Sequence, residues 1–387
     1  MKDYVPRRLR VLAVAIPAGA LAIFSALPAS AGLAHGDYKQ TNLVSDGFVP
    51  ANTTDEHLKN PWGISAGPAS GPATPFWVSD NGKGVTTLYA NGNPVFTDPP
   101  TNQHQLVVTI PPPRGSDPGT TSSPTGTVFN GTTDFVVSEG DKSGPARFLF
   151  ATEDGTISGW NPNVDFGSAI LEVDNSAGGA GAVYKGLALG SVGSAHFLYA
   201  SNFRAGVVER YDTNFTLSGT FTDPAVPLGF APFNVQSDAD IGGSHPGWLW
   251  VTFAKQNAEK HDDVAGSGNG FVDLFDTSGN LLRRFAAHGS LNSPWGLAIA
   301  PAGFGPFHGD LLVGNFGDGT INAFNLRTGK FHGQLGDGTG KSIVNDGLWG
   351  LRFGNGGAGG PRNTLFFTAG VNHEADGLYG SIASLDN

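Results

Sequence analysis

The stretch NSPWGLA at residues 292–298 decides the fold, because closely related stretches occur at two other places in the chain. They are NPWGIS at 60–65 and DGLWGLR at 346–352. A tryptophan, a glycine and an aliphatic residue used three times indicate one structural position in a repeated unit. Glycine there allows neighbouring backbones to approach closely, and we expect the adjacent tryptophan to fill the wedge between neighbouring units.

The repeated unit has a second element, an aromatic-rich strand that ends in small and polar residues. Its six copies are FWVSDN at 76–81, LFATED at 149–154, LYASNF at 198–203, LWVTFA at 249–254, LLVGNF at 311–316 and LFFTAG at 365–370. Their partners in the first element are Trp62-Gly63, Thr125-Gly126, Lys185-Gly186, Phe233-Asn234, Trp295-Gly296 and Trp349-Gly350. The spacing between the two elements is similar in every copy except the second, which carries an insertion.

A hairpin of two further strands completes the unit, as in LYANGNPVF at 88–96 and LFDTSGNLLRRF at 274–285. Asn-Gly and Ser-Gly pairs are typical of such turns, and four strands over about 50–60 residues are the size of one propeller blade. The sequence therefore predicts an all-β fold, a six-bladed β-propeller of four-stranded antiparallel blades. The last unit lacks an outer strand, and we expect residues 38–45 (YKQTNLVS) to supply it and close the ring.

The N-terminal segment predicts export. Positive residues precede an apolar run at 11–28 and the cleavage signal Ala29-Ser30-Ala31, which is the organisation of a secretory signal peptide. We therefore expect a signal peptide over residues 1–31, a single propeller domain over 32–387, and a secreted, extracellular monomer. No other apolar stretch is long enough to span a membrane. The formal net charge of −11 argues against a nucleic-acid partner.

Four of the six strand ends carry an oxygen-bearing side chain, and in a propeller these strand ends surround one mouth of the central channel. The four residues are Asp80, Glu153, Asn202 and Asn315. Oxygen ligands from several blades suit Ca²⁺ or another divalent cation, which can activate water. The alternative is that Asp and Asn occupy these positions only because they favour turns.

Other residues expected at the mouth are candidates for binding or catalysis. Those expected to contact a ligand are Trp62, Asn81, Arg204, Lys255, Gln256, Trp295 and Trp349. Lys255 and Gln256 begin a long loop, 254–270, which we expect to form a lid. His373 and Glu374, in NHEADG at 372–377, are candidates for a general base and its partner. The alternative is an exposed loop with a turn at its Asp-Gly pair.

The terminal motifs carry a resemblance to a family. NPWGIS with FWVSDNGKGVTTLY, DGLWGLRFG and FFTAGVNHEADGLYGSI resemble motifs of an uncharacterised family of secreted bacterial proteins. This resemblance implies export and the propeller fold, but no particular activity. More distantly, the blades are similar to NHL-type repeats and gluconolactonase-like propellers, in which carboxylate and amide side chains hold a divalent cation in the channel. By that resemblance Asp80, Glu153 and Asn202 would hold such a cation.

Two classes of function stay open at this point. A binding module would present the channel mouth to an extracellular ligand, namely a carbohydrate, a small molecule or a protein. An enzyme would be a hydrolase or lactonase that depends on a divalent metal at the mouth. The sequence contains no H-E-x-x-H or phosphate-binding loop motif, so we favour binding.

Overall fold

A computed structural model describes residues 35–68, 74–97, 101, 104–177 and 181–385. Residues 34–387 form one unit and residues 1–33 another, so the predicted signal peptide over 1–31 lies outside the described residues. Within them, the only helical elements are two 3-10 turns, η1 (Asn81–Lys83) and η2 (Gly305–Phe307). Every other regular element is a β-strand, which confirms the all-β prediction, and this part of the chain contains no helix suited to crossing a membrane.

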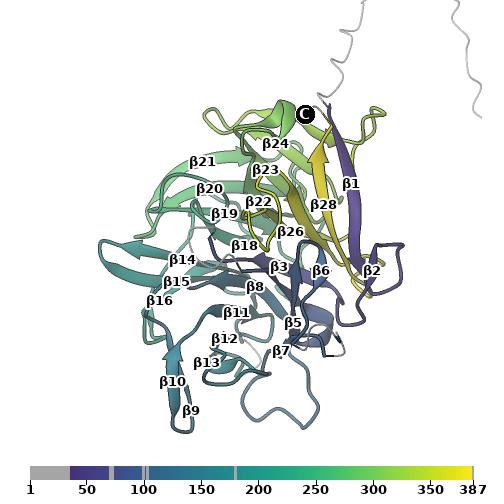
Figure 1. The fold of residues 1–387 in the computed structure, drawn as a ribbon. Helices are drawn as coiled ribbons and strands as arrows, with labels where there is room; N and C mark the ends of the chain where they lie inside the picture. Colours follow the sequence, from purple (N-terminus) through teal and green to yellow (C-terminus); the bar gives the residue numbers. More distant parts are fainter. Residues whose placement is uncertain (1–34, 69–73, 98–100, 102–103, 178–180, 386–387) are drawn as a thin grey trace, which may run out of the picture. The chain divides into compact units, whose positions relative to one another are not determined.

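The first four sheets follow one another along the chain (Figure 1). The first contains β3 (Pro61–Ser65), β4 (Phe76–Asp80), β5 (Val85–Ala90), β6 (Asn93–Pro94) and β7 (Val107–Thr109). The second contains β8 (Pro124–Phe129), β11 (Phe148–Thr152), β12 (Thr156–Trp160) and β13 (Ile170–Asp174). The third contains β14 (Tyr184–Val192), β15 (Ala195–Asn202), β16 (Val207–Tyr211) and β17 (Leu217–Phe221). The fourth contains β18 (Phe230–Ser237), β19 (Trp248–Lys255), β20 (Gly270–Asp276) and β21 (Leu281–Ala287).

The remaining strands form a nine-stranded sheet in which the start and the end of the described chain meet. Its members are β22 (Pro294–Ile299), β23 (Asp310–Asn315), β24 (Ile321–Asn325), β25 (Phe331–Gly336), β1 (His35–Ser45), β2 (Thr53–Thr54), β28 (Leu378–Ser384), β27 (Leu365–Ala369) and β26 (Leu348–Phe353). Strand β1 pairs antiparallel with β28, from Tyr38 opposite Ser384 to Ser45 opposite Leu378. It also pairs in parallel with the end of β25, and so joins the four strands β22–β25 to the three strands β26–β28.

The repeated strands lie where the sequence places them. All six aromatic-rich strands are present, as β4, β11, β15, β19, β23 and β27. The insertion expected in the second unit forms a separate hairpin, β9 (Val136–Glu139) with β10 (Lys142–Pro145). The connection between β7 and β8, residues 110–123, is rich in proline and contains no strand.

The innermost strands of the sheets contact one another in a closed series: β3 with β8, β8 with β14, β14 with β18, β18 with β22, β22 with β26, and β26 with β3. The glycines of the repeated motif make this approach possible. A Cβ on Gly126 would lie 2.4 Å from the backbone nitrogen of Leu187, and one on Gly296 would lie 2.4 Å from the Trp349 carbonyl oxygen. The prediction of close backbone approach is confirmed, and the sheets have a propeller-like arrangement.

The tryptophans of the motif meet one another across neighbouring inner strands. The Trp62 and Trp349 rings stack with centroids 3.4 Å apart, and Trp295 meets both edge to face. Phe203 and Phe233 complete a buried cluster, which we call the aromatic floor. Large rings at the beginnings of inner strands fill the space where these strands converge, so the centre is packed at this level.

Candidate functional site

A buried lysine lies on the aromatic floor. Lys185, near the start of β14, occupies the position that tryptophan takes in three other units, and it is only 2% exposed. Its ammonium nitrogen lies 5.0 Å from the centroid of the Trp62 ring and 5.8 Å from that of Phe203. Both distances suit cation–π contacts. Burying an ammonium group is costly unless anionic partners accompany it, and the loops above the floor supply them.

Glu153 is the first of these partners. It follows β11, and its backbone nitrogen bonds to the Ser123 carbonyl oxygen, which fixes the residue after the strand end. Its Oε1 contacts the Lys185 ammonium, while its Oε2 accepts a hydrogen bond from Asn81 Nδ2 at 2.9 Å. Because the sheets converge here, a carboxylate from the second sheet is held between side chains of the first and the third.

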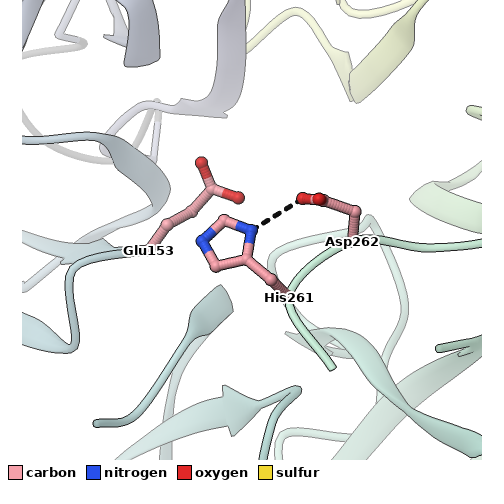
Figure 2. A group of neighbouring side chains, drawn as sticks. All are labelled: Glu153, His261 and Asp262. Carbon is pink, nitrogen blue, oxygen red and sulfur yellow. Dashed lines mark hydrogen bonds and ion pairs between the residues drawn. The ribbon is translucent and has the colours of Figure 1, made fainter. Parts of the chain in front are cut away.

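A short hairpin extension between β19 and β20 carries two more groups. Residues Gln256 and Asp263 pair across it, and the backbone nitrogen of Asn257 bonds to the Asp262 carbonyl oxygen at 2.8 Å. His261 Nδ1 lies 2.7 Å from Asp262 Oδ1, and the Glu153 carboxylate points toward the His261 ring (Figure 2). This bond raises the pKa of His261 and lowers the pKa of Asp262, because each charged form stabilises the other.

Glu374 approaches the same cluster from the loop between β27 and β28. Asn372, His373 and Glu374 all have left-handed backbone conformations, with φ values of 56°, 54° and 66°. Three such non-glycine residues in a row are costly and persist only where surrounding contacts hold them. Asn60 Nδ2 donates to Glu374 Oε1 at 3.1 Å. Burial, opposed by this bond and reinforced by the charge of Glu153, raises the pKa of Glu374 to about 7.

Together these side chains form what we call the Lys185 cluster. Its members are Lys185, Glu153, His261, Asp262, Asp263 and Glu374. Glu153 and Asp262 contact the lysine directly, whereas Glu374 and Asp263 are held by Asn60 and Ser293 and interact with its charge without an ion pair. Burial raises the pKa of Asp263 as well, opposed by its hydrogen bond with Ser293 and by the charge of Lys185.

A cavity of about 590 Å³ lies on the same face, between the loop after β15 and the hairpin extension. It is lined by Asn202, Arg204, Glu259 and Lys260, among others. A volume of this size accommodates a small molecule. Gln256 Nε2 donates to the Phe203 carbonyl oxygen at 2.5 Å, so the loop that bounds the cavity is tied to the aromatic floor.

The four residues expected to hold a divalent cation do not come together. Asp80 is fully buried and its Oδ2 accepts a hydrogen bond from Thr87. Asn202 donates to Glu209, and Asn315 donates to the Ser290 carbonyl oxygen. Of the four, only Glu153 belongs to the Lys185 cluster. The strand ends recur as predicted, but three of their side chains turn to separate partners.

A different set of donor atoms fits a cation in part. Ligand atoms of Glu153, His261 and Asp262 all lie within 4.8 Å of one another. The Lys185 ammonium, however, contacts Glu153 and lies 3.8 Å from Asp262 Oδ1. The lysine therefore stands where a cation would meet these carboxylates, and a metal would have to displace it.

The residues expected to bind a ligand do not all lie at one site. Asn81 belongs to the rim of the cluster, and Arg204 lines the cavity, where it donates to the Gly181 carbonyl oxygen. Lys255 is exposed at the end of β19, while Gln256 serves to hold its loop. Trp62, Trp295 and Trp349 are 1–3% exposed, so they form the floor beneath the site and offer no open platform.

The two residues of the candidate acid–base pair, His373 and Glu374, also lie in different surroundings. Glu374 is partly buried in the cluster, whereas His373 is exposed. Lys185 was not among the predicted site residues. The signal was present, since a lysine stands where the repeat carries tryptophan, but only the close packing of the inner strands shows that this position is central.

Comparisons with known proteins identify relatives of viral origin. The chain is 31% identical over 358 residues to "Uncharacterized protein R648" of Acanthamoeba polyphaga mimivirus, spanning 89% of this chain and 80% of that protein. It is 30% identical over 358 residues to "Uncharacterized protein L690" of the same virus, spanning 89% and 85%. None of these relatives is bacterial, so membership in a bacterial family stays a prediction. No protein-family model matches the chain.

Similar solved structures include a streptogramin B lyase, with a TM-score of 0.49 and 11% identity over 90% of this chain and 97% of that one. A luciferin-regenerating enzyme has a TM-score of 0.44 and 12% identity, over 85% of this chain and 92% of that one. At these scores the likeness carries no argument about activity.

Proposed function

The chain belongs to the family of the mimivirus proteins R648 and L690, and we propose that it is a six-bladed β-propeller that binds an amine-bearing small molecule at the Lys185 cluster. The excess of carboxyl groups around a single buried lysine is the observation that carries this proposal. The proposed location is extracellular, because the segment over residues 1–31 has the organisation of a signal peptide.

The closed series of contacts among β3, β8, β14, β18, β22 and β26 supports the six-bladed architecture. In this interpretation β1 is the outer strand of the last blade, and its pairing with β28 closes the ring. The parallel contact of β1 with β25 then links the last two blades and explains why their strands share one nine-stranded sheet. Closure in this way leaves no open array of blade edges.

The charges of the cluster support a cationic ligand. Glu153 is paired with Lys185, and Asp262 with His261, which leaves Glu374 and Asp263 without a positive partner of their own. An ammonium group beside them would restore the balance, and amide groups such as that of Asn81 add orienting hydrogen bonds. The adjacent cavity of about 590 Å³ would accommodate the remainder of the ligand.

Calorimetric titration at pH 8, where Glu374 is ionised, tests this proposal with putrescine and spermidine as amines and 1,4-butanediol as a neutral counterpart. We expect the amines to bind and the diol not to bind. Glu374→Gln should weaken amine binding by at least about tenfold, because a charge-assisted contact is worth roughly 1.5–3 kcal/mol. Glu139→Gln, on the exposed hairpin β9–β10, is the matched control. Equal affinities of the two variants, or binding of the diol, would contradict the proposal.

The second candidate is a divalent-metal site with hydrolase or lactonase chemistry. The approach of Glu153, His261 and Asp262 ligand atoms within 4.8 Å favours it. Because the Lys185 ammonium occupies this space, Lys185→Met should strengthen Ca²⁺ binding if a metal is the natural occupant. Calorimetric titration of the wild type and of Lys185→Met with CaCl₂ measures this difference in Ca²⁺ affinity. A lack of Ca²⁺ binding by both would remove the metal-dependent alternative.

A further inference from the structure

A second cavity lies at the opposite ends of the inner strands. Its volume is about 480 Å³, within the range of small-molecule sites. Ala66 follows the end of β3, Asp240 follows the end of β18, and Arg352 lies near the end of β26. By contrast, the Lys185 cluster is built at the beginnings of inner strands and from the loops beside them.

Two arginines line this cavity. The Arg352 side chain is 15% exposed; its Nη2 donates to the Ala66 carbonyl oxygen at 3.1 Å and contacts Asp240 Oδ1 at 3.3 Å. These contacts use one of its nitrogens and fix the direction of the guanidinium group. Arg362 is exposed and lines the same space. Among the described residues of the lining, Asp240 is the only acidic one. Two arginines and one aspartate therefore give these residues a net positive charge, in a chain whose formal net charge is −11.

The walls are apolar and held in place. Ile241, Ile299 and Phe353 contribute the apolar surface. The backbone nitrogen of Ile299 bonds to the Ile241 carbonyl oxygen at 2.7 Å, which ties the fourth sheet to β22. On the other side, Asn355 Nδ2 donates to the carbonyl oxygens of Gly67 and Thr74, both at 3.0 Å. Hydrogen bonds between sheets therefore shape the cavity before any ligand arrives.

We propose that this cavity binds a small organic anion, with its acid group on Arg352 and Arg362 and its apolar body against Ile241, Ile299 and Phe353. A guanidinium group offers several donors in a fixed plane and matches the oxygens of a carboxylate or a phosphate. Arg352 is oriented by Asp240 and the Ala66 carbonyl oxygen, so it loses little freedom on binding. Exposed Arg362 adds the second positive charge at the cavity opening.

Calorimetric titration with phenylacetate, phenyl phosphate and the neutral counterpart phenylacetamide tests the site. We expect at least one anion to bind and phenylacetamide to bind at least tenfold more weakly. Arg362→Gln should weaken anion binding about fivefold to tenfold, and it removes no hydrogen bond or ion pair described above. Arg352→Gln should weaken it further, with circular dichroism as the check on folding. Arg327→Gln, at a different cavity, should leave the affinity unchanged.

The two anions also distinguish the source of the ligand. Tighter binding of phenyl phosphate assigns the site to phosphate esters, and tighter binding of phenylacetate assigns it to carboxylates. Affinity should fall as the salt concentration rises, because exposed Arg362 attracts the anion through solvent. The proposal is overturned if neither anion binds, if phenylacetamide binds as well as the anions, or if Arg362→Gln and Arg327→Gln have the same effect.

Discussion

Replacing Glu374 with Gln should stabilise the protein at pH 8 and leave its stability nearly unchanged at pH 4.5. The folded protein raises the pKa of Glu374 from 4.5 to about 7. The native state therefore retains a proton that the unfolded chain releases, and stability falls as the pH rises from about 4.5 to 7. Each pH unit corresponds to about 1.4 kcal/mol, so the ionised side chain costs up to about 3 kcal/mol above pH 7. Glutamine removes this cost while its Oε1 can still accept from Asn60.

Urea unfolding of the wild type and Glu374→Gln at pH 4.5, 6 and 8 measures the effect. The difference in the free energy of unfolding should grow from near zero to between about 2 and 3 kcal/mol, with the variant more stable at pH 8. Glu139→Gln, on an exposed hairpin, should show no comparable growth. A difference that is independent of pH, or a variant that is less stable than the wild type at pH 8, would refute the argument that burial governs this carboxyl group.

Two further predictions concern the packing and the strand that joins the chain ends. Gly296→Ala should destabilise the folded protein by about 1–3 kcal/mol, because its Cβ would lie 2.4 Å from the Trp349 carbonyl oxygen. The control is Gly247→Ala, where a Cβ meets nothing within 4 Å. Thermal unfolding should give Gly296→Ala the lower melting temperature, and equal melting temperatures would contradict the prediction. Tyr38→Phe should lower the free energy of unfolding by about 1–2 kcal/mol, because the buried Tyr38 hydroxyl donates a hydrogen bond to the Phe304 carbonyl oxygen. An unchanged midpoint of urea unfolding would show that this hydrogen bond contributes nothing to stability.

The strands were predictable because each one is specified locally. Short aromatic-rich stretches between glycine-rich and asparagine-rich turns fix both the existence and the order of β4, β11, β15, β19, β23 and β27. The use of residues 38–45 as part of β1 followed from counting strands. The parallel pairing of β1 with β25 was not predictable, because it depends on how far β1 extends before Tyr38 and on the position of a neighbouring sheet.

The candidate site was only partly predictable, for a physical reason. Glu153 and Glu374 were identified because acidic residues at strand ends and in loops of one face are expected to converge. The direction of a side chain at a strand end is decided by local competition for hydrogen bonds, and sequence does not give its outcome. Asp80 accepts a hydrogen bond from Thr87, and Asn202 donates one to Glu209. Asp80 and Asn202 therefore do not reach the Lys185 cluster.

In a repeated fold, the residues at one position can be compared between units, and a residue that differs from the others can be recognised. Three units place tryptophan before the motif glycine, and the three rings pack against one another in the aromatic floor. Lys185 at the same position of the third unit cannot contribute a ring, and burying its charge would be costly without Glu153. Four of the six units carry an aromatic residue at this position, and the second carries the uncharged Thr125. A lysine that instead requires carboxylates from other sheets is the departure from the repeat on which the proposed binding role rests.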